Sequence, residues 1–377
     1  MKSFAMKRST ILILILLLAL AAVPVQAVDC GAEAMILYEP RTGTVLEEKN
    51  ADEQMLITST TKIMTALVVI EHCALYETVR ITEPMTGAEG SSLYLKAGQE
   101  FTVEELLYGL MLASANDAGV ALAVHAAGSV EGFADLMNEK AAELGLQNTH
   151  YVNPHGLDAP DHYSSARDLA LLTAAAMKNP VFCRFFSAQE RQFRGVTVQN
   201  HNKLLAGYPG CIGGKTGYTR GSGRTLVSCA ERDGLRLICV TLADPDDWDD
   251  HSALYDAAFA EYAFLSFPLE AWNSVPVISS AVSPVSLRCS EPYALVRKAD
   301  MQLLVELPRF VFAPVSKGDV LGSVTLKEKG REVLHADLTA ACDAPVDPEM
   351  RLRPWERFQS YLDRLTWTTD KPDFISV

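Results

Sequence analysis

Three short groups of polar residues follow one another along this chain in an order that suits acyl transfer by a serine. Ser59 and Lys62 form a Ser-x-x-Lys group, Ser114 and Asn116 form a Ser-Ala-Asn group, and Lys215 opens a Lys-Thr-Gly group. Each group alone is common enough to arise by chance. The ordered set, however, is typical of serine enzymes in which a lysine acts as the base.

The spacing of Ser59 and Lys62 has a direct chemical use. Residues three apart on a helix lie on one face, with their Cβ atoms about 5–6 Å apart, so that a hydroxyl and an amine can meet. We therefore expect a helix that begins at Ser59. Taken alone, Ser59 is explained equally well as the N-cap of that helix.

The N-terminal residues 1–27 have the composition of a secretory signal peptide. Lys2, Lys7 and Arg8 precede an apolar run over 11–22, and a small residue, Ala27, stands where cleavage would occur. The apolar run is too short to span a bilayer comfortably. We expect export and cleavage near Ala27.

The charge balance limits the partners of the exported chain. The leader carries three basic residues and no acidic ones, so the formal charge changes from −14 to −17, with 30 basic against 47 acidic residues. Such a surface is a poor partner for nucleic acid and for anionic lipid.

The eight cysteines show neither a disulfide framework nor a metal-binding spacing, because no two of them form Cys-x-x-Cys. Cys229 and Cys239 flank a turn at Asp233 and Gly234. A two-residue turn places position 229 opposite 238, so these two thiols would lie on opposite faces of the hairpin. We expect free, buried thiols and no metal site.

The elements that would position the three groups can be outlined from apolar periodicity, caps and turns. The mature chain should open with a hairpin, continue with helices, and return to strands before a last helix. Helices between terminal strands favour a sheet with helices packed on it. The predicted hairpin strands are 34–39 and 44–48. The first predicted helix begins at Ser59, and the others cover 102–112, 116–127, 130–144, 165–177 and 249–263. The later predicted strands are 215–219, 225–231 and 235–243.

A linker is predicted over 268–276, and the pattern after it is that of a small β-rich domain. Its five predicted strands are 282–288, 293–298, 302–307, 320–326 and 333–337, and nothing in them suggests chemistry. The predicted organisation is a signal peptide over 1–27, a catalytic domain over 28–272, a β-sandwich domain over 276–346 and a tail over 350–377.

The residues around these groups resemble the low-molecular-weight penicillin-binding proteins, and among them the serine-type D-alanyl-D-alanine carboxypeptidases of peptidase family S11. The stretches that carry the resemblance are STTKIMTAL, SSLYLKAGQEFTVEELLYGLMLASANDAGVALA, VNPHGLDAPDHYSSARDLA and GGKTGYT. It extends from about residue 34 to 344. It implies an α/β (α+β) fold: a β-lactamase/transpeptidase-like domain with an antiparallel sheet and a helical subdomain, followed by the β-sandwich.

The resemblance implies a role for each residue of the first two groups. Ser59 would attack the carbonyl of the penultimate D-alanine, and Lys62 would take its proton as a neutral amine, a state that burial and the charge of Lys215 would favour. Ser114 would relay the proton to the leaving amine. Asn116 would hydrogen-bond Lys62 or the substrate amide, and we expect both Ser114 and Asn116 to cap their helix as well.

In the third group the resemblance implies substrate binding. Lys215 and Thr216 would meet the terminal carboxylate, and Gly217 would let the substrate backbone approach the strand. The backbone N–H groups of Ser59 and Tyr218 would form the oxyanion hole.

The expected activity is removal of the terminal D-alanine from peptidoglycan pentapeptides outside the cytoplasm, with no cofactor and with β-lactams as covalent inhibitors. A separate deacylating glutamate of the kind that class A β-lactamases use is absent from the sequence. A transpeptidase or endopeptidase of the same family, or a non-catalytic envelope scaffold, stays open as an alternative. His155 is interpreted as an organiser of its turn.

The C-terminal tail has two equally weighted interpretations. Trp355, Phe358, Leu362 and Leu365 follow helical spacing, and this stripe would either touch the membrane surface or pack on the second domain. The negative charges of Glu356 and Asp363 cancel the positive charges of Arg357 and Arg364 in this segment. Any attraction to anionic lipid would therefore be weak.

Overall fold

A computed structural model describes residues 14–18, 28–266, 273–290, 293–298 and 301–347. The chain divides into two compact units, one over 23–263 and the other formed mainly by the residues from 264 onward. The predicted tail over 350–377 and most of the predicted signal peptide and linker lie outside the described residues.

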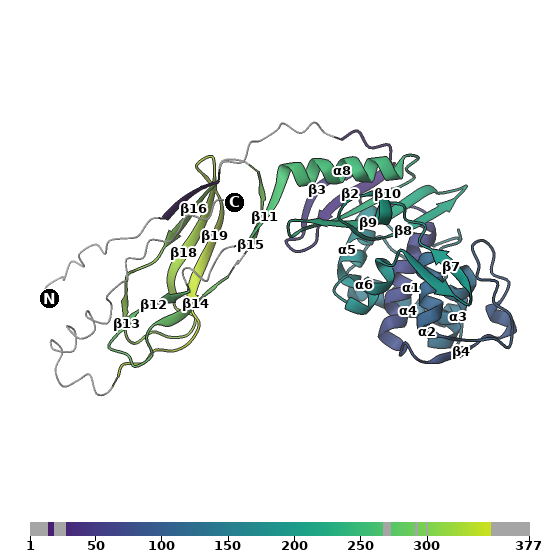
Figure 1. Cartoon of the computed structure of the whole chain (residues 1–377), viewed down its shortest axis with the longest axis horizontal. Coiled ribbons are helices and arrows are strands. Elements are labelled where there is room, and N and C mark those ends of the chain that lie inside the picture. Colours follow the sequence, from purple (N-terminus) through teal and green to yellow (C-terminus); the bar gives the residue numbers. More distant parts are fainter. Residues whose placement is uncertain (1–13, 19–27, 267–272, 291–292, 299–300, 348–377) are drawn as a thin grey trace. The chain divides into compact units, whose positions relative to one another are not determined.

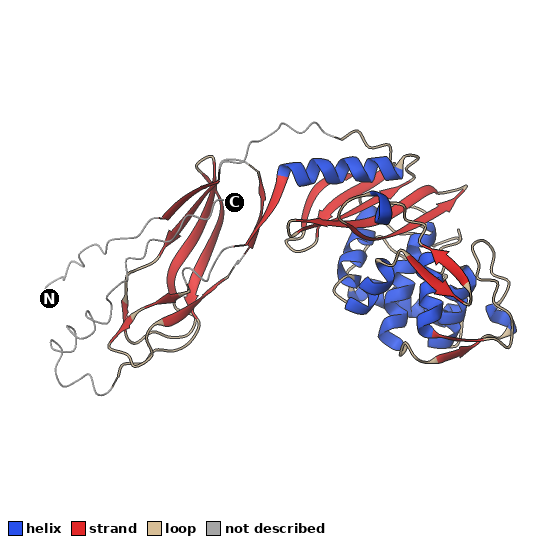
Figure 2. Ribbon diagram, viewed as in Figure 1, coloured by secondary structure: helices blue, strands red, loops and turns tan. Residues whose placement is uncertain are grey.

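The first unit is built on a five-stranded antiparallel sheet (Figure 1; Figure 2). Its strand order is β3-β2-β10-β9-β8, so the sheet joins the two ends of the unit as predicted, and β8 is its last strand. The strands are β2 (Ala34–Glu39), β3 (Thr44–Lys49), β8 (Cys211–Thr219), β9 (Gly223–Arg232) and β10 (Leu235–Leu242).

Helices cover both faces of this sheet. On one face α8 packs on β9 and β10, and on the other face α5 packs on β2 and β10. Successive side chains of β10 point to opposite faces of the sheet, which explains its packing against both α5 and α8. Ile238 and Val240 point into the main apolar core, whereas Thr241 hydrogen-bonds His251 of α8. The helices are α1 (Lys62–His72), α2 (Val103–Leu112), α3 (Asn116–Ala127), α4 (Val130–Glu143), α5 (Ala166–Ala176), α6 (Pro180–Phe186), α7 (Leu204–Gly207) and α8 (Asp247–Glu261).

The local signals that predicted these helices are visible in the structure. Thr102 and Glu105 form a capping box at the start of α2, Ser165 caps α5 and Gly128 ends α3 in the left-handed conformation. Two short two-stranded sheets complete the unit. One pairs β4 (Thr78–Arg80) with β5 (Glu100–Thr102), which follows a long connection containing the 3₁₀ turn η2 (Glu83–Met85), and the other is the hairpin of β6 (Glu190–Phe193) and β7 (Val196–Gln199).

The second unit is dominated by a six-stranded sheet with the order β1-β16-β18-β19-β14-β12. Val277, Val285, Val315, Ala340 and Ala344 form its small apolar cluster. The strands of this part are β11 (Tyr262–Ser266), β12 (Ser274–Val275), β13 (Val277–Ile278), β14 (Val285–Cys289), β15 (Tyr293–Arg297), β16 (Met301–Glu306), β17 (Val311–Phe312), β18 (Val320–Glu328) and β19 (Arg331–Ala340). The predicted mixed fold with a C-terminal β-sheet domain is confirmed.

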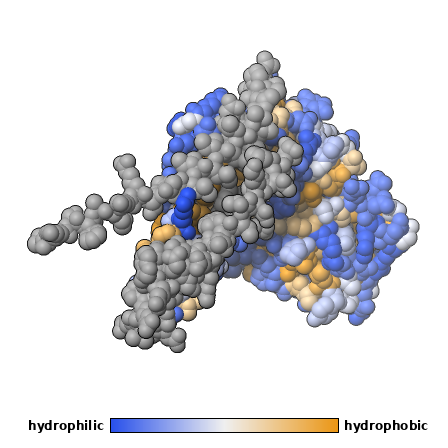
Figure 3. Space-filling view, turned by 60° about the vertical axis from the view of Figure 1, so that its left-hand side comes forward, coloured by the Kyte–Doolittle hydropathy of each residue, from blue (hydrophilic) through white to orange (hydrophobic). Residues whose placement is uncertain are grey.

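In the uncleaved chain, β1 (Leu14–Leu18) pairs antiparallel with β16. These residues belong to the predicted signal peptide, whose removal stays a prediction. Among the described residues, no single helix is long and apolar enough to cross a bilayer, although α3 and α4 pass by length and composition as a pair bent by 82°. In Figure 3 hydrophilic residues cover much of the visible face, with smaller apolar areas between them.

All eight cysteines are unbridged. Cys229 lies opposite Ile238 in the β9–β10 ladder, which is the register that the turn predicted. The expectation of free, buried thiols is confirmed for Cys229 and Cys239, whereas burial does not extend to all eight: Cys30 is also buried, Cys342 is exposed and the others are half-buried.

Candidate active site

The predicted nucleophile lies in a tight turn in front of a helix. Ser59 belongs to a 3₁₀ turn, η1 (Thr58–Thr61), and α1 starts directly after it at Lys62. Ile57 and Thr61 occupy the two N-cap positions. Ser59 therefore caps neither helix, which leaves its hydroxyl available for chemistry.

Lys62 is fully buried, and three oxygens surround its amine. Its Nζ lies 2.9 Å from Ser59 Oγ, 2.7 Å from Asn116 Oδ1 and 2.6 Å from the carbonyl oxygen of His155. The last two can only accept hydrogen bonds. A neutral amine has two N–H bonds and one lone pair, so donation to Asn116 and His155 leaves the lone pair facing the Ser59 hydroxyl.

The electrostatics favour this neutral form. Burial, together with the nearby charge of Lys215, lowers the pKa of Lys62 well below its usual value. Burial also lowers the pKa of Lys215, to about 7. Two lysines that are 0% and 1% exposed thus share one buried region, and the charge of Lys215 adds to burial in favouring the neutral amine of Lys62.

Asn116 is held in the orientation that the amine requires. Its Nδ2 donates to the carbonyl oxygen of Glu89 at 2.6 Å, which turns Oδ1 toward Lys62. Its backbone N–H donates to Ser91. Gly90 between them has φ +86°, and a Cβ there would lie 2.9 Å from Asn116 Nδ2.

Ser114 serves the other lysine. Lys215 Nζ donates to Ser114 Oγ at 3.0 Å, and Ser114 has a left-handed φ of 56° that orients this side chain. The expectation that Ser114 and Asn116 also cap α3 is wrong, because the N-cap is Ala115 and makes no side-chain bond. Both polar side chains are directed at lysines instead.

Strand β8 packs directly against η1. A Cβ on Gly217 would lie 1.8 Å from Thr58 Oγ1, 2.4 Å from Thr225 Oγ1 and 3.0 Å from the backbone nitrogen of Ser59. Gly217 was predicted to let the substrate backbone approach the strand. It has a second, structural role, because the absence of a side chain allows η1, which carries Ser59, to contact β8 directly. Ser59 N–H, a predicted oxyanion donor, accordingly lies beside the strand that carries Tyr218.

The remaining predicted substrate-binding residues are more accessible. Thr216 is half-buried and Tyr218 is 68% exposed. Tyr218 pairs with Arg224 across the β8–β9 ladder, and an open hollow of about 660 Å³ is lined by both of them together with Met55 and Leu56, just before η1. Arg224 itself forms an ion pair with Asp247.

Sequence reasoning missed the loop that supports η1 from the other side. The carbonyl oxygen of His155 bonds Lys62, and a Cβ on Gly156 would lie 1.7 Å from the carbonyl oxygen of Thr58. The His155 ring accepts from Leu157 N–H, and burial lowers its pKa to about 3. The ring therefore stays neutral and organises its turn, whereas the backbone contacts the site.

The contact between η1 and β8 leads to a testable result. Gly217→Ala should lower the rate of acylation by penicillin by about 100-fold, because displacing reacting groups by about 1 Å has effects of that size. Gly207→Ala is the matched control, since a Cβ at that position would have no atom of the described residues within 4 Å beyond its chain neighbours and its own helix backbone. Stopped-flow acylation rates measure both. Equal rates for the two variants would contradict the packing described above.

The coupling of the two lysines predicts a shift in pH dependence. Acylation should fall as the pH is lowered through the depressed pKa of Lys62, where the amine gains its proton. Lys215→Gln removes the like charge, raises the Lys62 pKa and should move this acid limb to higher pH. Lys203→Gln, a change of an exposed lysine, is the control. An acid limb that stays in place or moves to lower pH in Lys215→Gln would contradict the coupling.

Comparison with known proteins agrees with this geometry. The family model described as D-alanyl-D-alanine carboxypeptidase matches residues 21–246. The chain is 34% identical over 334 residues to the D-alanyl-D-alanine carboxypeptidase DacF of Bacillus subtilis, covering 83% of this chain and 85% of that protein.

Solved structures show the same fold. Penicillin binding protein 5 from Haemophilus influenzae matches with a TM-score of 0.69 and 28% identity, over 86% of this chain and all of that one. A variant of the Streptomyces K15 DD-transpeptidase matches with a TM-score of 0.58 and 33% identity, over 62% of this chain and 99% of that one. The chain therefore belongs to the D-alanyl-D-alanine carboxypeptidase family, Peptidase S11.

Proposed function

We propose that this protein removes the terminal D-alanine from peptidoglycan stem peptides that end in D-Ala-D-Ala, outside the cytoplasm. The observation that carries the proposal is the fully buried amine of Lys62, whose Nζ lies 2.9 Å from Ser59 Oγ. Family membership supplies the substrate class, since the relatives are named for this activity.

In the proposed reaction Ser59 Oγ forms a bond to the carbonyl carbon of the penultimate D-alanine while Lys62 takes its proton. The negative oxygen would lie between the N–H groups of Ser59 and Tyr218. As the C–N bond breaks, the proton passes to the leaving amine through Ser114, and D-alanine departs. Water then attacks the ester and returns a proton to Ser59 Oγ.

The substrate carboxylate would be held by the third group. The hydroxyl of Thr216 and the charge of Lys215 suit a carboxylate, and strand β8 is at the end of its sheet, so an extended peptide can pair with it. The open hollow beside Tyr218 offers room for the chain of the stem peptide. A β-lactam would enter as a mimic of the same dipeptide and leave slowly.

The test is release of D-alanine from a purified pentapeptide ending in D-Ala-D-Ala, with and without penicillin. The proposal predicts release that penicillin abolishes. An acceptor amine such as glycine is added in a parallel reaction, because one structural relative is a DD-transpeptidase. Absence of release, or transfer to glycine in place of hydrolysis, would contradict the carboxypeptidase assignment.

A further inference from the structure

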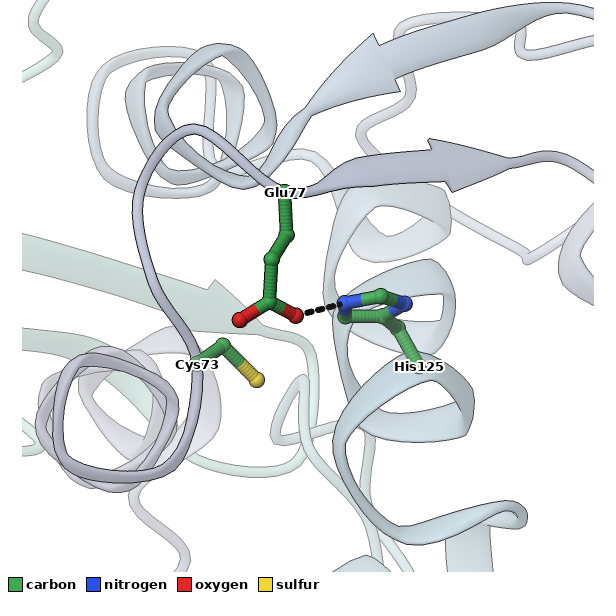
Figure 4. A group of neighbouring side chains, drawn as sticks. All are labelled: Cys73, Glu77 and His125. Atoms are coloured by element: carbon green, nitrogen blue, oxygen red, sulfur yellow. Dashed lines mark hydrogen bonds and ion pairs between the residues drawn. The ribbon is translucent and has the colours of Figure 1, made fainter.

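Away from the active site, three side chains of different chemistry meet at the far ends of two helices. Cys73 follows α1, Glu77 precedes β4 and His125 lies in the last turn of α3, and one ligand atom of each lies within 4.8 Å of the others (Figure 4). His125 Nε2 is 2.9 Å from Glu77 Oε2, as the dashed line in Figure 4 marks. Cys73 lies beside this pair.

The surroundings of the cluster favour a cation. Both α1 and α3 end here, and helix C-termini carry partial negative charge from their last carbonyl groups. Glu77 is also held in place, because its second oxygen accepts the backbone N–H of Ala74 at 2.7 Å. A carboxylate fixed in this way presents its other oxygen in a defined direction, as outer hydrogen bonds do for metal ligands.

The ligand set is one that transition metals prefer. A thiolate, an imidazole and a carboxylate together suit Zn²⁺, which binds sulfur, nitrogen and oxygen in a tetrahedral arrangement. The site is open to solvent on one side, since the side chains of His125 and Glu77 are 23% and 42% exposed. A water molecule can therefore complete the shell.

We propose that Cys73, Glu77 and His125 bind one divalent transition ion, with Zn²⁺ as the best fit. Binding releases the thiol proton of Cys73, and the His125–Glu77 hydrogen bond is replaced by two bonds to the metal. The sequence predicted no metal site, because the spacing of the cysteines shows none and the three ligands come from separate elements.

The position of the site gives the ion a structural use. The first residues of the same two helices are Lys62 and Asn116, which hydrogen-bond each other in the active site. Cys73 comes 11 residues after Lys62 and His125 nine residues after Asn116, so the helical rise places the ion about 14–17 Å from the active-site ends, too far to join the reaction. The ion therefore acts as a clamp that fixes α1 against α3.

Cobalt binding tests the proposal on the reduced, metal-stripped full chain. Co²⁺ substitutes for Zn²⁺ and its bond to a thiolate gives a near-ultraviolet charge-transfer band. The wild type should bind one equivalent of Co²⁺ more than the variants Cys73→Ser and His125→Ala. The thiolate charge-transfer band should be weaker in Cys73→Ser than in the wild type. Glu77→Gln, which keeps the side-chain shape, should weaken binding at least about 10-fold.

Two variants serve as controls. Cys183→Ser removes another half-buried thiol of the same unit, and Cys30→Ser removes the thiol of the other potential ligand group among the described residues, Cys30, Asp244 and Asp250. Both should keep the ion that Cys73→Ser loses. Unchanged stoichiometry and an unchanged band in Cys73→Ser and His125→Ala would overturn the proposal.

Thermal unfolding gives a second, independent measurement. Zn²⁺ at about 100 times its Kd should raise the ratio of folded to unfolded protein about 100-fold. This gain should be absent in Cys73→Ser and present in Cys183→Ser. An equal Zn²⁺-dependent stabilisation of Cys73→Ser and Cys183→Ser would show that the ion binds elsewhere and would overturn the proposal that it fixes α1 against α3. Neither measurement depends on the proposed enzymatic activity.

Discussion

Ser59→Ala is expected to abolish both D-alanine release and covalent labelling by a fluorescent penicillin. Without Oγ no ester forms, so the rate of release should fall by at least about 10⁴-fold, the scale seen when a catalytic nucleophile is removed. The fold should survive, because Ser59 caps no helix and only its Oγ is deleted.

Ser252→Ala is the matched control for this change. Ser252 lies on α8, where, among the described residues, its hydroxyl donates to the Trp248 carbonyl within its own helix. Its labelling and turnover should equal those of the wild type. Labelling that persists in Ser59→Ala would mean that another residue carries the acyl group.

Lys62→Met is expected to have the second largest effect, a loss of about 10³–10⁴-fold in the acylation rate with Ser59 still present. Methionine fills a similar volume without a lone pair, so no base takes the serine proton. The change removes a buried amine but also leaves Asn116 Oδ1 and the His155 carbonyl oxygen without their donor, so the rates are compared well below the melting temperature of the variant.

Lys178→Met controls for loss of a lysine charge, since Lys178 is an exposed residue just after α5. Its acylation rate should be unchanged. The acylation rate is read from penicillin labelling over time. If Lys62→Met acylates at the wild-type rate, another group is the base.

The helices and central strands of the first unit were predictable because their signals are local. The capping box at Thr102, the cap at Ser165 and the stop at Gly128 depend only on neighbouring residues. Several short elements of this unit were missed for the opposite reason, namely the β4–β5 pair, α6, the β6–β7 hairpin and α7. Helix α6 is only seven residues long, and the β6–β7 hairpin is largely exposed, so neither leaves a clear apolar period.

The sequence predicted which residues form the active site, but not which side chain hydrogen-bonds which lysine. From the sequence, Asn116 was assigned either to Lys62 or to the substrate amide, and no lysine partner was assigned to Ser114. The structure directs Asn116 to Lys62 and Ser114 to Lys215. That division depends on the left-handed backbone at Ser114, which changes the direction of the chain just before α3 and which no spacing rule predicts.

Contributions from the backbone were the least predictable. The carbonyl oxygen of His155 accepts from Lys62 whatever side chain position 155 carries, so residue identity gives no hint of it. The closeness of Gly217 to Thr58 joins residues more than 150 positions apart. The sequence did not predict the cluster of Cys73, Glu77 and His125 for the same reason, because the cluster joins residues that are distant in the sequence and that meet where two helices end.

The central claim is that Ser59 carries the acyl group and Lys62 activates it. The most direct measurement is peptide mass spectrometry of the enzyme quenched with acid soon after mixing with penicillin. The account predicts one penicilloyl adduct on the peptide that contains Ser59, formed in the wild type and lost in Ser59→Ala. An adduct on Ser114, or on any peptide without Ser59, would contradict it.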